Sequence, residues 1–546
     1  MESRPLIVPQ PAMDGVLDYK GRPISKLGTG GWSAIFFILG IEMAERVAFN
    51  GIMFNLISYM TGPLGQSTAS AAIGVAVWTG VGTMFPIAGA LIADSFLTRY
   101  HTIIISSLLY VLGLGLLSLS TVLPNTCDEN ADRVACRPST FSLGLFYFSL
   151  YLVAFAESGH RPCVQAFGAD QFDEADTNES ISRSSFFNWW LFALGIALSA
   201  SAFILSYVDD NFSWGLGFGI PCVLMGIALI AFLMGSRFYR CHALKVENPY
   251  VGIVKALATL ARRRLFSSDK SEIETAPDSS NQTMFDDGDE SLIAHQIVEA
   301  KGLLRVFPIW ATCLPFTIVT YQYSTFFTKQ GATLNRSIGS NFQIPPAALQ
   351  SITSLTITIF VGVYDLFFVP SARKLTGIPS GITKLQRIGT GILISVIVMV
   401  NAALVETKRL QTAKEFGLVD EPSSVLPMNI AWLFPQYILM GFAELFAIAG
   451  MQEFFYDQMP DGLRSFGVAL CLSTFGMGGF INSLLIEVID KASKTFGGDS
   501  WFSNNLNRAH LDYFYWLLAV LGLASLALFI CFARAYEYKK KRKIDV

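Results

Sequence analysis

Charged residues are scarce in this sequence. Asp, Glu, Lys and Arg together make up 15% of the 546 residues, against about a quarter in an ordinary soluble domain. Hydrophobic residues account for 52%, and the formal net charge is only −3. The balance of charge gives no reason to expect nucleic acid as a partner. The composition argues against a soluble protein, so the question is how often the chain crosses a bilayer.

The residues from which enzymes build metal and nucleophile sites are also few. The five histidines are scattered without metal-ligand spacing, and no G-x-x-x-x-G-K-[ST] run offers a nucleotide site. These absences argue against a membrane enzyme and a primary pump, and we expect no cofactor. Of the eight cysteines, Cys127 and Cys136 lie together in one loop, where a disulfide and two free thiols are both open.

Long apolar runs are what the sequence has in abundance. A membrane-crossing helix needs ~20 mostly apolar residues, and helices are the default because every backbone polar group must be satisfied without water. Twelve runs qualify: 33–60, 68–97, 102–123, 141–169, 185–207, 214–237, 306–329, 347–370, 385–405, 427–456, 464–490 and 511–534. We predict an all-α membrane protein with twelve transmembrane helices in two six-helix halves.

The runs divide the chain into five parts. These are a tail (1–32), a six-helix bundle (33–237), a linker (238–305), a second bundle (306–534) and a basic tail (535–546). In the linker, residues 251–265 and 291–304 have helical periodicity, and residues 267–290 are predicted to be disordered. Because basic residues gather in both tails and in the linker, both termini are predicted to be cytosolic.

The fourth and tenth runs share a pattern. Phe155-Ala156-Glu157 is followed by Asp170-Gln171, and Phe442-Ala443-Glu444 is followed at the same spacing by Asp457-Gln458. Phe167 and Phe454 also fall in register. The match suggests that the second six helices repeat the first six, an arrangement found in transporters that bind substrate between their halves.

Ionisable residues inside apolar runs carry the functional signal. Glu42, Glu45 and Arg46 share one helix face because they are three and four residues apart. A single such charge at the bilayer centre costs at least ~2.5 kcal/mol. We therefore predict that the cluster handles an ion, with a structural ion-pair network as the alternative. Arg161 can pair with Glu157 on its own helix or face the first run.

A proton gradient is the energy source that this chemistry predicts. A carboxylic acid in a low-dielectric cavity retains its proton, and an approaching arginine favours its release. A group of this kind can load a proton on one side of a membrane and release it on the other.

At these residues the chain resembles a known family. Glu42-Met43-Ala44-Glu45-Arg46 fits the ExxER motif of the proton-coupled oligopeptide (POT/PTR2) transporters, and residues 167–174 resemble that family's second motif. With the long loop after the sixth run and Glu444 in a Gly-Phe-Ala-Glu context, residues 28–535 resemble the plant nitrate and peptide transporter (NRT1/PTR) branch. The resemblance implies a major facilitator fold, alternating access and proton symport of nitrate, a di- or tripeptide or another small organic metabolite.

The resemblance also implies site residues. Glu42, Glu45 and Arg46 would couple protons, and Glu444 would meet a substrate amine. Three positions depart from the family: Arg161 stands where a lysine is common, Phe49-Asn50 where peptide carriers often have tyrosines, and Thr320 where the best-known nitrate carrier has a histidine. The candidate substrate-binding residues are Arg161, Glu444, Thr320, Gln322 and Asn50, with Glu157, His160 and Tyr321 as secondary candidates.

Some alternatives stay open at this point. The expected partners are a small-molecule substrate, protons and the lipid bilayer, while the oligomeric state is not indicated. A sensor of the same fold would bind its ligand without accumulating it. Aromatic residues of the seventh and tenth runs, among them Tyr323, Phe326 and Tyr437, could line a substrate pocket or fill helix interfaces. Residues 2–7 match an acidic dileucine sorting pattern, which favours the vacuolar over the plasma membrane.

Overall fold

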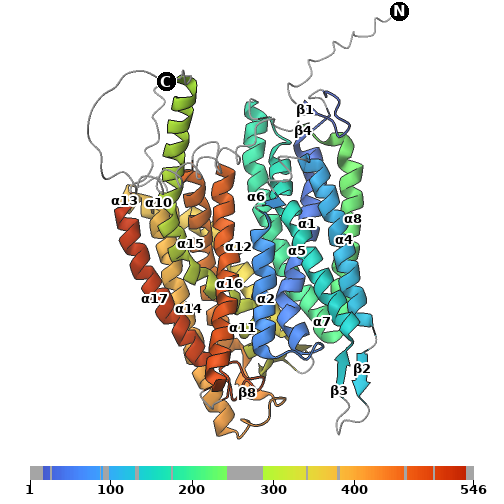
Figure 1. Cartoon of the computed structure of the whole chain (residues 1–546), viewed down its shortest axis with the longest axis vertical. Helices are drawn as coiled ribbons and strands as arrows, with labels where there is room; N and C mark the ends of the chain where they lie inside the picture. The colour runs from blue at the N-terminus through green and yellow to red at the C-terminus, as the bar shows by residue number, and fades with distance from the viewer. Residues whose placement is uncertain are drawn as a thin grey trace, which may run out of the picture.

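The computed structural model shows a bundle of long helices (Figure 1). It describes residues 16–24, 28–86, 88–89, 97–123, 125–128, 135–173, 176–242, 287–339, 342–377, 382–459, 464–495 and 499–536. The sorting pattern at 2–7, the predicted helix at 251–265, most of the predicted disordered stretch at 267–290 and most of the C-terminal tail lie outside these residues.

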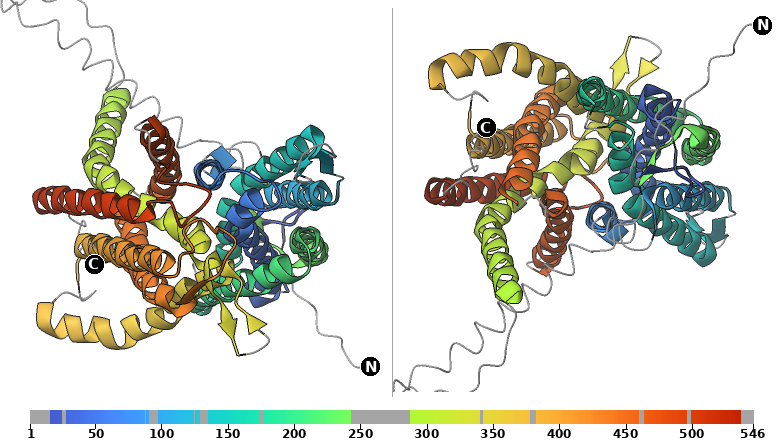
Figure 2. Two further views of the ribbon diagram at one scale, coloured as in Figure 1. Left: turned by 90° about the horizontal axis from the view of Figure 1, so that it is seen from below. Right: turned by 90° about the horizontal axis from the view of Figure 1, so that it is seen from above.

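The helices form two groups that follow chain order. The first group is α1 Gly31–Thr61, α2 Thr68–Met84, α4 Arg99–Val122, α5 Thr140–Ala169, α6 Thr177–Ala200, η1 Ser201–Leu205, α7 Ser206–Asn211, α8 Trp214–Met234 and η2 Gly235–Phe238. The second is α10 Asp287–Ser324, α11 Phe326–Ala332, η4 Pro346–Leu349, α12 Gln350–Val363, η5 Tyr364–Phe368, α13 Val369–Thr376, α14 Lys384–Glu415, η6 Ile430–Leu433, α15 Phe434–Gln458, α16 Arg464–Thr495 and α17 Leu511–Ala535. End-on views show the two groups side by side (Figure 2).

Short strands occur only as pairs within the described part of the chain. They are β1 Val16–Leu17, β2 Asn125–Asp128, β3 Ala135–Pro138, β4 Cys241–His242, β5 Leu334–Asn335, β6 Ser337–Ile338, β7 Phe342–Gln343 and β8 Leu426–Asn429. The β2–β3 hairpin places Cys127 directly opposite Cys136 in the strand register. A disulfide requires close backbones of this kind, and the choice between a disulfide and two free thiols stays open.

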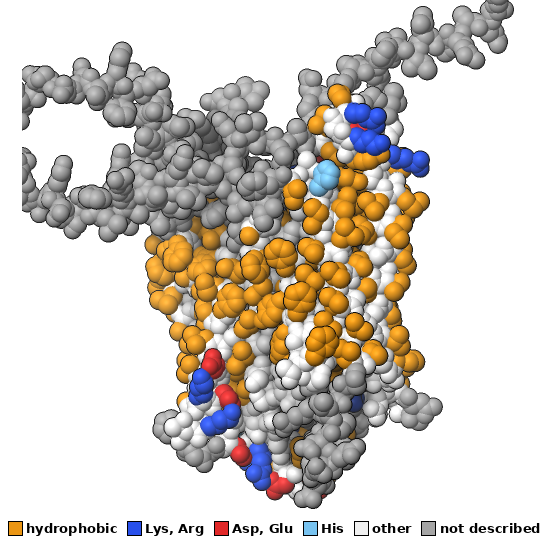
Figure 3. Space-filling model, turned by 45° about the vertical axis from the view of Figure 1, so that its right-hand side comes forward, with side chains coloured by type: hydrophobic (Ala, Val, Ile, Leu, Met, Phe, Trp, Pro, Cys, Tyr) orange, Lys and Arg blue, Asp and Glu red, His pale blue; other side chains and the backbone are white. Residues whose placement is uncertain are grey.

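Nine helices among the described residues are long and apolar enough to cross a membrane. The remaining predicted runs coincide with α1, which carries three charges, with α2 and with the second half of α10. The count of twelve crossings stays a prediction for these three. On the face shown in Figure 3, an apolar band lies between ends that carry the charged side chains, as a bilayer requires.

Several helix ends differ from the predicted edges. The helix predicted at 291–304 is the first part of α10, which continues without a break into the seventh run. That run then breaks at Thr325 and resumes as α11, rather than forming one helix over 306–329. The predicted ninth run was too short, because α14 continues ten residues past 405 to Glu415.

The internal repeat predicted from the fourth and tenth runs is confirmed by matching contacts. Asp170 pairs with Arg99 at 2.5 Å, and its counterpart Asp457 pairs with Lys384. Each basic residue begins the preceding helix, α4 or α14. Likewise Phe167 lies edge-on to Tyr239, and Phe454 lies edge-on to Tyr536, with ring centroids 5.2 Å apart in both pairs. The two halves are built on one plan.

The halves meet along α2 with α16 and α6 with α12. At the first crossing, a Cβ on Gly80 would lie 3.1 Å from the carbonyl oxygen of Gly476, and a Cβ on Gly476 would lie 3.1 Å from that of Gly80. Small residues permit such close approach between membrane helices. The glycines therefore bring the two backbones together at this crossing.

Polar contacts close the halves on the side away from the start of α1. Lys329 of α11 donates to Thr61 at 3.0 Å, and Arg336 pairs with Asp210 at 3.0 Å. Gln350 donates to the carbonyl of Phe54 at 3.0 Å. The first two of these contacts border a cavity of about 270 Å³. The conformation is thus closed at this end.

We expect Arg336→Ala to loosen this closure. A partly exposed ion pair is worth up to about 1 kcal/mol, so opening at this end should increase up to about fivefold. The measurement is labelling of a cysteine placed at Asn55, which lines the cavity, by a membrane-impermeant maleimide. Arg508→Ala is the control, because Arg508 pairs with Asp420 inside the second half. Equal labelling in the two variants would contradict the prediction.

Candidate functional site

The charged cluster of α1 is buried and internally paired. Arg46 Nε and Nη2 both lie 2.8 Å from Glu42 Oε1, and Nε lies 3.4 Å from Glu45 Oε2. Both glutamates are fully buried. The helix spacing of three and four residues produces this arrangement, as the sequence predicted.

Tyr110 of α4 joins this cluster to α5. Its hydroxyl lies 3.0 Å from Glu45 Oε1 and 2.8 Å from Glu157 Oε2. The sequence analysis missed Tyr110, because a tyrosine in an apolar run has the same pattern as a packing residue. One phenol thus links carboxylates that two different helices supply.

The structure shows which group Arg161 pairs with, a question that the sequence left open between Glu157 and the first run. It lies 3.3 Å from Glu157 on its own helix, while Arg46 approaches the same carboxylate at 3.8 Å. The Arg161 side chain is 27% exposed, in contrast to the fully buried Glu157. Exposing an arginine to lipid is costly, so this surface is best explained as facing a polar space between the helices.

His160 lies next to Arg161 and is fully buried. Its ring is edge-on to Tyr110 at 6.0 Å. One ligand-type atom from each of Glu42, Glu45 and His160 lies within 4.8 Å of the other two, a grouping that could hold a metal ion. The Arg46 guanidinium already bonds Glu42 in this group and would repel a cation.

Glu444 is the counterpart of Glu157 on α15. It is partly buried, and no hydrogen bond or ion pair holds its carboxylate within the part of the chain that the structure describes. Tyr323 lies within range of its charge. The two equivalent carboxylates therefore differ: Glu157 is paired with arginines, whereas Glu444 has no such partner among the described residues.

The other predicted substrate residues are largely engaged in helix packing. Gln322 donates to Asn482 at 3.0 Å, and Tyr321 donates to the carbonyl of Phe475 at 2.8 Å. The Thr320 hydroxyl donates to the carbonyl of Thr317 at 2.7 Å, and Asn50 donates to the carbonyl of Arg46 at 2.8 Å. In this conformation their donors are taken by the protein.

Two of the aromatic residues belong to helix interfaces. Phe326 stacks on Phe502 at 5.1 Å, and Tyr437 lies edge-on to Phe327 at 5.7 Å. Both are fully buried. In this structure these two residues therefore fill helix interfaces rather than line a substrate pocket.

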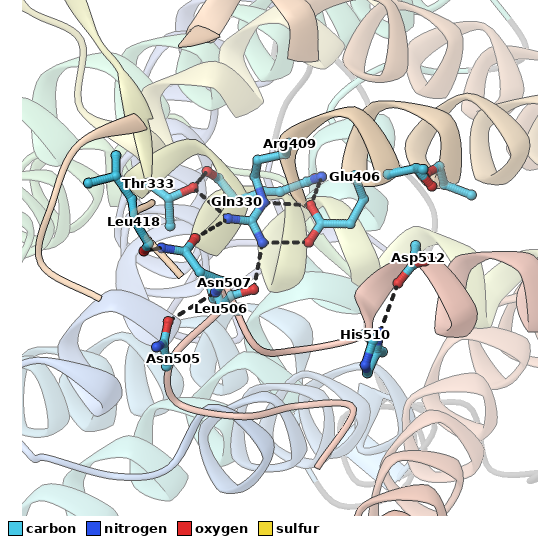
Figure 4. A network of polar contacts seen from close by, with 12 residues as sticks. Gln330, Thr333, Glu406, Arg409, Leu418, Asn505, Leu506, Asn507, His510 and Asp512 are labelled. Carbon is cyan, nitrogen blue, oxygen red and sulfur yellow. Dashed lines mark hydrogen bonds and ion pairs between the residues drawn. The ribbon is translucent and has the colours of Figure 1, made fainter. Parts of the chain in front are cut away.

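A second buried charge network was missed by the sequence analysis (Figure 4). Arg409 forms a two-pronged pair with Glu406 on α14, at 2.8 and 2.7 Å. Gln330 of α11 donates to Glu406 at 2.5 Å, and Arg409 donates to Asn507 at 2.8 Å. The network ties α11 to α14 and to the segment before α17. Its signal was Glu-x-x-Arg directly after the predicted end of the ninth run.

Comparisons with known proteins agree with this architecture. The sequence profile described as "POT family" matches residues 100–502. The chain is 49% identical to the Arabidopsis thaliana "Protein NRT1/ PTR FAMILY 5.14" and 47% identical to "Protein NRT1/ PTR FAMILY 5.10", each over 545 residues and 97% of both chains.

Among solved structures, the chain is similar to an "auto inhibited POT family peptide transporter", with a TM-score of 0.70 at 20% identity. The match covers 93% of this chain and 98% of that one. The likeness confirms the predicted major facilitator fold.

The Glu406–Arg409 pair gives a stability prediction. Glu406→Ala should lower the melting temperature by several degrees, because it leaves a buried guanidinium unpaired at a cost of ~3–5 kcal/mol. The double variant Glu406→Leu with Arg409→Met should recover most of the loss, because no buried charge remains. Thermal unfolding in detergent measures both. Glu487→Ala, which breaks an exposed pair with Lys491, is the control; a double variant as unstable as the single one would argue against this account.

Proposed function

Because the chain belongs to the POT family and is similar along its length to plant NRT1/PTR proteins, it is a multi-pass membrane transporter of peptides or similar small solutes, and we propose that it is a proton-coupled symporter working by alternating access. Family members are transporters rather than enzymes. The proposal concerns the energy source, the site and the class of solute.

The observation that carries the proton coupling is an uneven set of buried charges. The cluster contains three carboxylates, Glu42, Glu45 and Glu157, but two guanidiniums, Arg46 and Arg161. Three minus two leaves one negative charge when all are ionised. A buried net charge is costly, and a single proton removes it. The cluster is therefore suited to holding one proton.

The pairing geometry suggests how that proton is released. Arg46 is within 3.8 Å of all three carboxylates, so a shift of its side chain changes which carboxylate it neutralises. The carboxylate that Arg46 leaves gains affinity for a proton, and the one that it approaches loses it. Because α1 also contacts α10 and α11 of the second half, rocking of the halves would change the surroundings of Arg46 and so could favour one pairing over another.

The solute is proposed to bind between Arg161 and Glu444. Arg161 belongs to the first half and is partly exposed, while Glu444 lies in the second half without a protein partner among the described residues. A zwitterion such as a dipeptide would satisfy both charges, with its carboxylate on the guanidinium and its ammonium on the glutamate. An anion such as nitrate would use Arg161 alone.

The coupling is tested by Glu45→Gln in proteoliposomes. With labelled dialanine and ¹⁵N-nitrate as probes, gradient-driven accumulation should fall at least about tenfold, because an amide cannot carry the proton. Exchange of the accumulated probe without a gradient should persist. Glu421→Gln is a suitable control, because Glu421 lies in the exposed loop after α14. If the wild type accumulates a probe to the same level with and without a proton gradient, the coupling is rejected.

The same assay separates a sensor from a transporter. A sensor of this fold would bind a probe without accumulating it, whichever gradient is imposed. No observation in the structure favours this second function, so accumulation by the wild type is the expected outcome.

Glu444→Gln should separate the two solute classes. Losing a charge-assisted hydrogen bond costs ~1.5–3 kcal/mol, so the KM for dialanine should rise about 10- to 100-fold, while nitrate uptake should stay near that of the wild type. Glu453→Gln is the matched control, because Glu453 faces Lys384 and Arg387 near the end of α15. Equal losses for both probes would contradict the assignment of Glu444 to a substrate cation.

The proposed location within the cell rests on the sorting pattern at residues 2–7 and on the side of the bundle where the first and last helices have their outer ends. We retain cytosolic termini and the vacuolar membrane as the proposed arrangement, since α1 begins and α17 ends on the same side of the bundle (Figure 1). A fluorescent fusion that is unaffected by Leu6→Ala with Ile7→Ala would remove the sorting argument.

A further inference from the structure

His160 is the buried titratable group that the coupling scheme leaves unused. Neither ring nitrogen has a hydrogen-bond partner among the described residues, and the side chain is fully buried. Buried polar groups nearly always have a partner. Two carboxylate oxygens beside it, Glu42 Oε2 and Glu45 Oε2, also lack a hydrogen bond. Unsatisfied donors and acceptors of this kind rarely gather in one place without a role.

The surroundings of His160 come from three helices. The ionisable groups that face it are Glu42, Glu45 and Arg46 from α1, Tyr110 from α4, and Glu157 from its own helix, α5. Arg161 follows His160 in the chain and pairs with Glu157. The two guanidiniums are fixed positive charges, because arginine is not deprotonated in proteins. The Tyr110 hydroxyl, which has a single proton to donate, is already within hydrogen-bond distance of Glu45 and Glu157. His160 is therefore the one neutral base among these groups.

Charge counting favours a proton over a metal ion at this place. With its carboxylates ionised, the cluster carries one negative charge, as counted above. An imidazolium at His160 brings the total to zero, whereas a divalent cation would bring it to plus one, next to the guanidinium of Arg46. The His160, Glu42 and Glu45 atoms lie within 4.8 Å of one another, and the His160 nitrogens form no hydrogen bond among the described residues. This arrangement suits proton transfer through one water or after a small side-chain rotation.

We propose that His160 is a second proton acceptor of the transport cycle, which exchanges the coupled proton with Glu42 and Glu45. In this step the carboxylic O–H bond of Glu42 or Glu45 breaks and an N–H bond forms on the imidazole. The carboxylate left behind stays paired with Arg46, so no charge is stranded. The reverse transfer returns the proton to a carboxylate when Arg46 moves away. The inference rests on the proposed proton coupling and adds to it a group that holds the proton between two transfer steps.

The test compares His160→Gln and His160→Asn with the wild type in proteoliposomes. Both amides can donate and accept hydrogen bonds but cannot carry a proton. We expect dialanine or nitrate exchange without a gradient to stay within about twofold of the wild type, and gradient-driven accumulation to fall at least about tenfold with a changed pH profile. His101→Asn is the control, because His101 bonds Thr98 at the start of α4 and should keep full coupling.

The outcomes separate this inference from the proposal beneath it. A wild type that accumulates neither probe with the gradient rejects the proton coupling itself. A gradient-driven wild type together with fully coupled His160 variants overturns the role of His160 alone. If both variants lose exchange as well, infrared difference spectra of histidine-labelled wild type decide: a histidine that is protonated over the same pH range as transport supports the role, and histidines that do not follow transport overturn it.

Discussion

The structure depends on one electrostatic constraint, which is that the cluster formed by α1 and α5 holds more carboxylates than guanidiniums. Glu42, Glu45 and Glu157 surround Arg46, and Arg161 pairs with only one of them. In water this imbalance would have little effect, whereas within apolar helices each uncompensated charge is expensive. Within the membrane an odd number of such charges favours the binding of one more cation, and we propose that this cation is a proton.

The repeated plan of the two halves makes their differences informative. Both halves use an acidic residue at the end of one helix to bind a basic residue at the start of the preceding helix. Both also clamp a phenylalanine against a tyrosine after their last helix. Against this shared frame, Glu157 is surrounded by arginines while Glu444 is not. This difference underlies our proposal that the first half handles the proton and the second half contributes a charge to the solute.

What the sequence could predict follows from the range of the interactions involved. The shared face of Glu42, Glu45 and Arg46 was predictable because helix geometry alone sets it, and the repeat was visible in the Phe-Ala-Glu pattern. The contacts of Tyr110 were not, since they depend on how α4 packs against α1 and α5. The pair of Glu406 with Arg409 was missed because a polar helix end is indistinguishable from a solvated one until its neighbours Gln330 and Asn507 are in place. The break at Thr325 likewise has no marker in an otherwise apolar run.

The crossing of Gly80 and Gly476 has a mechanical consequence. Where two helices meet at glycine backbones, with Met84 and Phe480 as the nearest side chains, few side chains have to change rotamer when the angle between the helices changes. Interlocked side chains resist such motion in steps, because each must be released before the next can engage. The contact between α2 and α16 would therefore let the angle between the two halves change with few side-chain rearrangements, while the two helices stay in contact.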